Sequence, residues 1–194
     1  NSSEHEPTAG AAWLDLDGDG FIDLYLANFN CWANYTHYVD RMWRNKGDGT
    51  FEELTGAGGF LGESSAKLAS RGATPADYDG DGDVDLFVHT YVLLRDLLYR
   101  NDGANKVTEV GDKVGVAGHA VLSGGVKRYG HGIGSSWGDL NGDGLLDLVV
   151  ANLAHPRFWD FSDKSGVFIQ QKDGTFIDLQ GNWDAPIGGA GLTY

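Results

Sequence analysis

The sequence is poor in cysteine, in basic residues and in long apolar runs, and each shortage excludes a class of protein. Its one cysteine, Cys31, cannot form a disulfide within the chain, so no disulfide framework supports the fold. Lysine and arginine number 14 against 28 acidic residues, and the net charge of −14 argues against nucleic acid or an anionic membrane as a partner. No apolar run reaches membrane-spanning length, because the longest, residues 145–154, is interrupted by Asp147.

Glycine, by contrast, is abundant, and it accompanies a repeat. The chain contains 30 glycines without the triplet period of collagen, which indicates many tight turns. Three acidic segments align without gaps from residues 15, 77 and 139, so each begins 62 residues after the one before (77 − 15 and 139 − 77). They read DLDGDGFID, DYDGDGDVD and DLNGDGLLD. Such a period is too long for a helical solenoid and suits one four-stranded blade of a β-propeller.

Each acidic segment lies in the same context of predicted strands. A small or glycine-rich lead-in precedes it, and a strand with apolar alternation follows it, as in residues 22–26. A third strand and a turn into a fourth complete the unit, as in residues 43–45 and 51–54. Leucines at helical spacing favour a helix over residues 91–99, but the repeat register leads there into the third strand. We follow the register and predict no helix there.

The repeat predicts an all-β fold of three four-stranded antiparallel blades and the first strand of a fourth. The predicted boundaries are residues 1–60, 61–122, 123–184 and 185–194. A propeller needs at least four blades to close, and three alone leave two open β edges. We therefore expect the chain to be part of a larger ring.

The acidic segments have the ligand pattern of a calcium site. Oxygen ligands at positions 1, 3 and 5, a carbonyl at position 7 and a carboxylate at position 9 suit Ca²⁺, which prefers six to eight oxygens. Without a cation, neighbouring carboxylates repel one another by about 1 kcal/mol per pair even in water. The three predicted sites, in which Phe21, Asp83 and Leu145 contribute carbonyl oxygens, comprise Asp15, Asp17, Asp19, Phe21 and Asp23; Asp77, Asp79, Asp81, Asp83 and Asp85; and Asp139, Asn141, Asp143, Leu145 and Asp147.

Two other interpretations of the acidic segments are weaker. An EF-hand needs a bidentate Glu at position 12, where this chain has Leu26, Val88 and Val150 within strand patterns. A solvated acidic turn without metal explains one such segment better than three in register. Asn141 lowers the charge of the third site, which we expect to be the weakest of the three.

The three loops, the strands after them and the stretch from Arg44 to Phe51 resemble FG-GAP/VCBS-type repeats, as in the α-integrin head and in cartilage acidic protein-like repeats. The resemblance implies calcium between the first two strands of each blade, seven blades as the common case, and extracellular or periplasmic placement. It implies no single activity, because the fold hosts adhesion modules, lectin-like modules and polysaccharide lyases.

Calcium in these loops is expected to be structural, and this bears on location. Extracellular calcium saturates weak sites, whereas cytosolic calcium would leave the loops empty and self-repelling. We therefore expect an extracellular or cell-surface protein, with the periplasm as the alternative.

Strand polarity places the acidic loops at one end of each blade and the longer loops at the other. The longer loops collect aromatic and basic residues, which suit sugar or protein recognition, although such residues also pack loops against a core. We favour a non-catalytic binding or adhesion module, whose partner is a glycan, a protein or the remaining blades of the same protein. The candidate ligand-binding residues are Trp32, Tyr35, His37, Tyr129, His131, His155, Arg157 and Trp159.

The alternative is a catalytic propeller of the polysaccharide-lyase type. It would use His131 or His37 as base, Tyr129 as acid and Arg157 to neutralise the substrate carboxylate. No sequence motif singles out these residues, and cleavage of a uronic-acid polymer would distinguish the two functions.

Overall fold

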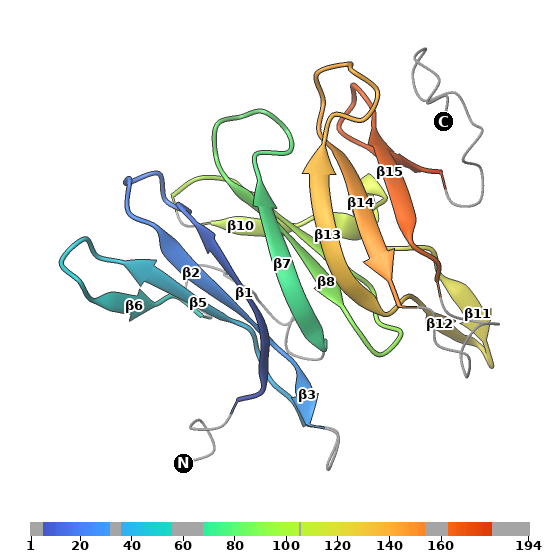
Figure 1. Cartoon of the computed structure of the whole chain (residues 1–194), viewed down its shortest axis with the longest axis horizontal. Coiled ribbons are helices and arrows are strands. Elements are labelled where there is room, and N and C mark those ends of the chain that lie inside the picture. Colours follow the sequence, from blue (N-terminus) through green and yellow to red (C-terminus); the bar gives the residue numbers. More distant parts are fainter. Residues whose placement is uncertain (1–5, 32–35, 56–67, 105, 154–162, 180–194) are drawn as a thin grey trace.

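A computed structural model of the chain describes residues 6–31, 36–55, 68–104, 106–153 and 163–179 and shows an all-β fold (Figure 1). Three four-stranded antiparallel sheets follow one another along the chain, and two short hairpins accompany them. Among the described residues, the only helix is the four-residue α2 (Gly111–Val114), and no helix is long and apolar enough to cross a membrane. The predicted fold of four-stranded antiparallel blades is thereby confirmed.

The strands of each sheet run in chain order from one edge to the other. The first sheet contains β1 (Thr8–Leu14), β2 (Asp23–Asn28), β5 (Arg41–Asn45) and β6 (Phe51–Glu53). The second contains β7 (Ser70–Ala76), β8 (Asp85–Thr90), β9 (Leu97–Asn101) and β10 (Val107–Glu109). The third contains β13 (Gly132–Gly138), β14 (Asp147–Asn152), β15 (Gly166–Gln170) and β16 (Phe176–Asp178). The two hairpins pair β3 (Asn30–Cys31) with β4 (Thr36–His37), and β11 (Val121–Ser123) with β12 (Val126–Arg128).

The first strands of the three sheets, β1, β7 and β13, lie side by side in the middle of the assembly (Figure 1). Their backbones approach closely, because a Cβ atom on Gly10 of β1 would lie 2.5 Å from the Arg71 carbonyl oxygen of β7. Only glycine fits such an approach without a shift of the backbone. The acidic loops leave all three sheets at the same end.

The second sheet is buried on both faces, which explains its nearly continuous apolar sequence. Leu86 and Val88 pack toward the first sheet, in one apolar cluster with Tyr25. Phe87, which lies between them in β8, packs toward the third sheet, in a second cluster with Leu148. All six residues of β8 are buried. The apolar contacts between blades therefore hold the array together.

Side-chain amides at the ends of the third strands also connect neighbouring blades. Asn101 Nδ2, at the end of β9, donates a hydrogen bond to the Leu16 carbonyl oxygen in the first acidic loop (2.7 Å). Gln170 Nε2, at the end of β15, donates to the Tyr78 carbonyl oxygen in the second acidic loop (3.1 Å). Leu16 and Tyr78 both occupy the second position of their loops, so the contact repeats from one blade to the next.

Residues 91–99 form no helix, as the repeat register predicted. Tyr91 is followed by a turn in which Val92 and Leu93 have φ angles of 61° and 63°, and β9 begins at Leu97. Leu97 and Leu98 therefore face the two neighbouring blades from β9, whereas Leu93 and Leu94 precede the strand.

The predicted blade boundaries stay predictions. The boundary at 122/123 falls within β11, a strand of a hairpin that belongs to none of the four-stranded sheets. Residues 185–194, the predicted first strand of a fourth blade, lie outside the described residues.

Candidate metal centre

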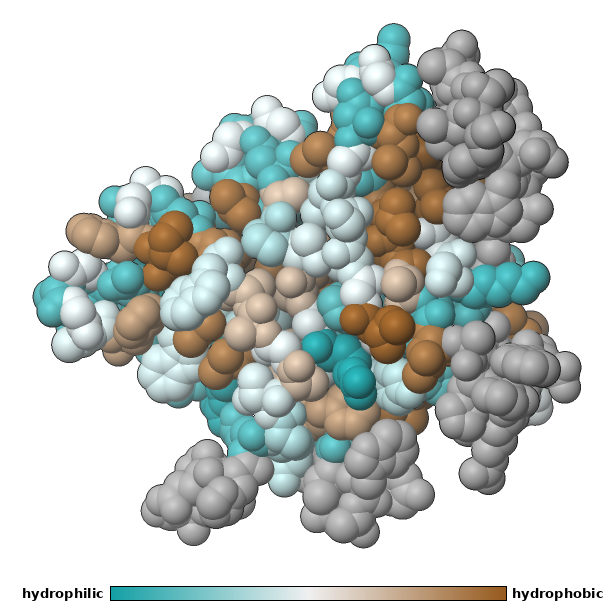
Figure 2. Space-filling model, in the orientation of Figure 1, coloured by the Kyte–Doolittle hydropathy of each residue, from teal (hydrophilic) through white to brown (hydrophobic). Residues whose placement is uncertain are grey.

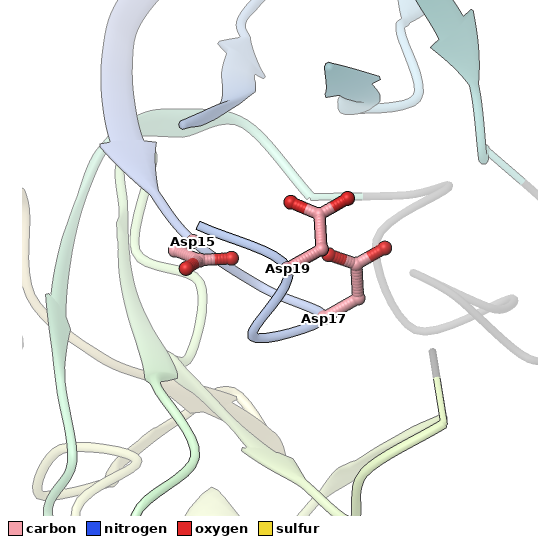
Figure 3. Close-up of side chains that lie close together, drawn as sticks. All are labelled: Asp15, Asp17 and Asp19. Carbon is pink, nitrogen blue, oxygen red and sulfur yellow. The ribbon is translucent and has the colours of Figure 1, made fainter. Parts of the chain in front are cut away.

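The loop between β1 and β2 brings three carboxylates together (Figure 3). One carboxylate oxygen each of Asp15, Asp17 and Asp19 lies within 4.8 Å of the other two. Gly20, at position 6, has a φ angle of 88°, which lets the chain turn back on itself at a conformation that other residues rarely adopt. The turn gathers the side chains at positions 1, 3 and 5 of the loop around one point.

The loop between β7 and β8 also gathers three carboxylates, but a different three. Asp77, Asp79 and Asp85 each have an oxygen within 4.8 Å of the other two. Asp85 is the aspartate at position 9, and it is almost completely buried at the start of β8. In the second loop, the ninth-position carboxylate is thus close enough to share a cation with the first and third positions.

The loop between β13 and β14 carries an amide at the third position. Asn141 Nδ2 donates to Asp143 Oδ2 (3.0 Å), an attractive contact where the other loops place two carboxylates. The first-position carboxylate of Asp139 accepts backbone N–H groups from Gly142 (2.7 Å) and Gly144 (2.9 Å), and these bonds, that of Gly144 foremost, lower the pKa of Asp139. The loop is thereby ordered by its own hydrogen bonds.

The ninth-position aspartates have a second role, which the sequence pattern alone did not indicate. Asp23 accepts the Leu16 N–H at Oδ2 (2.9 Å) and the Asn45 N–H at Oδ1 (2.7 Å), which connects the acidic loop to the end of the third strand. The other two copies repeat this arrangement: Asp85 accepts from Tyr78 and Asn101, and Asp147 accepts from Leu140 and Gln170. All three carboxylates are 0–1% exposed.

Burial sets the protonation of these aspartates. It raises the pKa of Asp23, Asp85 and Asp147, against the backbone N–H groups, which lower it. For Asp85 the pKa rises to about 7, and the neighbouring acids Asp79 and Asp81 add to the effect. A cation in the loop would instead lower these pKa values, because its positive charge attracts the ionised carboxylates.

Two oxygens in the first loop provide a test of whether a cation fits. Asp15 Oδ1 and Asp17 Oδ1 are buried and have no hydrogen-bond partner. Buried carboxylate oxygens normally find a donor or a metal, because leaving them unpaired is costly. Both belong to the group of three acids around one point, and the donors there are all oxygens, which suit a hard cation such as calcium. The residues of this loop therefore fit the ion that the repeat pattern predicts.

An arginine stands beside each of the first two loops. Arg44 Nη1 lies 3.5 Å from Asp17 Oδ2, and its Nη2 lies 3.6 Å from Glu52 Oε2 on β6. Arg100 holds the same place in β9: it forms an ion pair with Asp102 (2.6 Å), and its charge opposes the burial that raises the pKa of Asp79. The third blade has Ile169 at this position. These arginines could have been found from the sequence, because an Arg-Asn pair ends the third strand in two of the three copies.

Buried acids at the other end of the blades were not predicted from sequence. Asp40, just before β5, accepts the Asn28 N–H (2.6 Å), the Tyr25 hydroxyl (2.6 Å) and the Ser70 hydroxyl of the next blade (2.7 Å). Burial raises the pKa of Asp40 to about 6. Asp96, just before β9, accepts the Thr90 N–H (2.7 Å).

Burial raises the pKa of Asp96 further, to about 8. In the third blade Ser165 occupies this position, and its hydroxyl accepts the Asn152 N–H (3.1 Å). The same contact between the end of the second strand and the start of the third is thus made by two acids and one alcohol.

The described residues include three of the eight predicted ligand-binding residues. His37 and Tyr129 are half-buried. His131 is 3% exposed and packs its ring against Tyr91 at a centroid distance of 4.6 Å, so it lacks the exposure that a ligand contact or a catalytic base requires. The other five lie outside the described residues: Trp32, Tyr35, His155, Arg157 and Trp159.

Comparison with known proteins agrees with the repeat and the sheets. Residues 8–88 match the model of the FG-GAP-like repeat family. Two curated relatives, cartilage acidic protein 1 of Homo sapiens and of Mus musculus, are 23% identical to this chain over 177 and 178 residues, or 87% of its length. The chain spans about a quarter (25%) of the length of each relative. Residues 8–88 are thus similar to the FG-GAP-like repeat, in agreement with the resemblance seen in the sequence.

Proposed function

We propose that this chain is a calcium-stabilised binding module. The observation that carries the proposal is the pair of buried, unpartnered oxygens on Asp15 and Asp17, which belong to a group of three acids around one point. No donor among the described residues compensates these oxygens, and calcium would. The sequence repeat extends the argument to the second and third loops.

Different residues would hold the ion in each loop. Asp15, Asp17 and Asp19 would do so in the first, and Asp77, Asp79 and Asp85 in the second. The third loop offers Asp139, Asn141, Asp143 and Asp147 by the same pattern. When bound, calcium neutralises the loop acids, and a site with free calcium at 100 times its dissociation constant stabilises the fold by about 2.7 kcal/mol.

Binding a partner is the second half of the proposal. FG-GAP-like repeats are typically extracellular adhesion or binding modules, and the match over residues 8–88 supports the same use here. We place the chain outside the cell or at its surface, with the periplasm as the alternative, and its ligand at the blade ends opposite the acidic loops. A protein or a glycan would be the partner.

Thermal melting with and without calcium tests the metal half. Calcium is expected to raise the melting temperature of the full chain, and calorimetric titration is expected to give three sites per chain. Asp19→Asn should weaken the calcium response by removing one loop charge. Asp48→Asn, in an exposed turn between β5 and β6, is the matched control and should leave the response unchanged. No calcium response in the wild type, or equal responses in both variants, would contradict the proposal.

A further inference from the structure

One exposed cation, Arg71, is held in place by aromatic rings and has no acidic partner among the described residues. Arg71 lies on β7, at the end opposite the acidic loops, and its guanidinium carbon is 5.3 Å from the Phe29 ring centroid and 4.8 Å from that of Tyr91. Contact with two rings restricts the guanidinium and leaves its N–H groups available for an acceptor. The side chain is therefore ordered before any ligand arrives.

Among the described arginines, Arg71 and Arg128 differ from the rest in having no ion pair with an acid of the described residues. Four other arginines in the described ranges form ion pairs: Arg41, Arg44, Arg95 and Arg100. The chain carries 28 acidic residues against 14 basic ones, so acids are plentiful. Within the described ranges, Arg71 nevertheless forms no ion pair, and its exposed guanidinium is open to an outside carboxylate.

The rings that hold Arg71 are themselves fixed. Tyr91 packs against Phe29 (5.8 Å between centroids) and against His131, and its N–H donates to the Ala69 carbonyl (2.8 Å). The turn after Tyr91 contains Val92 and Leu93 at positive φ, a conformation that persists only where surrounding contacts enforce it. Leu93 receives such contacts: its N–H donates to the Gly130 carbonyl (3.1 Å), and its carbonyl accepts the Tyr129 N–H (3.0 Å).

Comparison of the three blades shows that the fold itself does not require this arrangement. One repeat length of 62 residues from Arg71, β1 has Ala9 and β13 has Ile133. The position of Phe29 and Tyr91 is taken by Leu153 in the third blade. Among the described residues, a cation between two aromatic rings thus occurs once, whereas the first strands of the other two blades form without an arginine at this position.

We propose that Arg71 is the anchor of a binding site for an acidic segment of a protein partner, with a carboxylate accepting two hydrogen bonds from its guanidinium. This assignment deepens the binding role proposed above and rests on it. A guanidinium and a carboxylate can form two parallel hydrogen bonds with each other. Arginine, tyrosine and phenylalanine are also enriched at protein interfaces.

The neighbouring surface favours a peptide over a sugar. Ile133 and Leu153 are 46% and 40% exposed at the equivalent positions of the third blade, and they offer aliphatic contacts for the residues beside the acid. Figure 2 shows brown apolar and pale surface, interrupted by a teal patch, across the face that the first strands form, and teal surface at the loop ends. The guanidinium lies over both aromatic rings, so those ring faces are not open for a sugar to stack on.

An NMR titration of the full chain tests the proposal through the Arg71 Nε–H signal. The probes are an N-acetylated Leu-Asp-Leu amide, the matching Leu-Asn-Leu amide, and an oligogalacturonate as a carboxylate on a sugar. The Asp peptide is expected to shift the signal and to bind at least about tenfold more tightly than the Asn peptide, because only the carboxylate forms a charge-assisted pair. Arg71→Gln should abolish this preference with the melting temperature unchanged.

The control is Arg128→Gln, which removes an arginine that has no ion pair within the described ranges but lies between no rings; peptide binding should survive it. Equal binding of the two peptides, no binding of either, or an equal loss in both variants would overturn the proposal. A shift with oligogalacturonate alone would assign the site to a glycan and overturn the protein partner. Calcium-dependent melting on the same samples separates these results from a failure of the proposed metal role.

Discussion

At the loop end of every blade, a buried aspartate accepts the same two backbone N–H groups, from Leu16 and Asn45 in the first copy. At the opposite end, the buried group before the third strand is Asp40, then Asp96, then Ser165. The loop end repeats both its sequence and its contacts, whereas the opposite end keeps the contact and changes the residue. The first pattern is what the proposed calcium requirement would produce in all three blades. The second pattern tolerates different residues in each blade, and Arg71 is one residue at this end that occurs in a single blade.

Asp85→Ala is expected to have the largest effect on stability, because it removes a buried acceptor at the loop end, where the contacts repeat in all three blades. The substitution leaves the Tyr78 and Asn101 N–H groups without their acceptor in a buried site. Each unsatisfied buried donor costs about 1–3 kcal/mol, so for two donors we expect a loss of roughly 2–6 kcal/mol in the free energy of unfolding. Urea denaturation with a chelator present measures the loss without any contribution from calcium. Stability equal to that of the wild type under chelation would mean that the aspartate acts only through a metal.

The opposite end is expected to respond to pH in the absence of calcium. Burial raises the pKa of folded Asp40 from its ordinary 3.8 to about 6, so the folded state binds this proton more tightly than the unfolded state. The stability linked to Asp40 is therefore fully present below pH 3.8 and lost as the pH rises through 6, by about 2–3 kcal/mol. Asp96, whose folded pKa is about 8, extends the loss to higher pH.

Chemical denaturation in chelator at pH 5 and pH 8 measures this pH dependence. Asp40→Asn should reduce the difference between the two pH values, because the amide does not titrate. A wild type that is more stable at pH 8 than at pH 5 would show that the hydrogen bonds to Asp40 outweigh its burial.

The smallest expected effect concerns the charge beside the first loop. Arg44→Gln removes a positive charge 3.5 Å from Asp17, so calcium should bind the first site about three- to tenfold more tightly, as Coulomb repulsion across several ångströms of water would give. Arg41→Gln is a control on the same strand, since Arg41 pairs with Glu6 and Glu53 instead. Calorimetric titration of both variants measures the change. Weaker calcium binding in Arg44→Gln would show that the arginine orders the loop more than it repels the ion.

The repeated parts of the fold were predictable from the sequence because they recur at a constant spacing. The loops and the strands after them follow from the 62-residue register. The strand at residues 97–101 begins 56 residues after its counterpart at 41–45 (97 − 41), and the Arg-Asn pair that ends both strands aligns them in spite of the helical spacing of the leucines. The buried acids at the opposite end were not predictable in this way. Asp40 and Asp96 lie after loops of different length, and a serine replaces them in the third blade, so no fixed spacing connects them.

The remaining misses arise from contacts that a local pattern does not contain. The ninth-position aspartates match the ligand pattern, but their bonds to the third strand join residues 16–23 positions apart, as in Asp85 with Asn101 and Asp147 with Gln170. An arginine occupies the Arg71 position in one blade only, so a search for residues shared by the copies does not find it. His131 sits among polar and aromatic neighbours in sequence, but the fold buries it.

The amide contacts between blades give the array a direction. Asn101 in the second blade donates to the loop of the first, and Gln170 in the third donates to the loop of the second. The first and second acidic loops therefore each supply an acceptor to the following blade. Disorder in the first loop would remove one of the two acceptors of the buried Asn101 amide, which would keep its bond to the Val84 carbonyl oxygen. A disturbance of the first loop is therefore expected to affect the second blade, and a disturbance of the second loop is expected to affect the third.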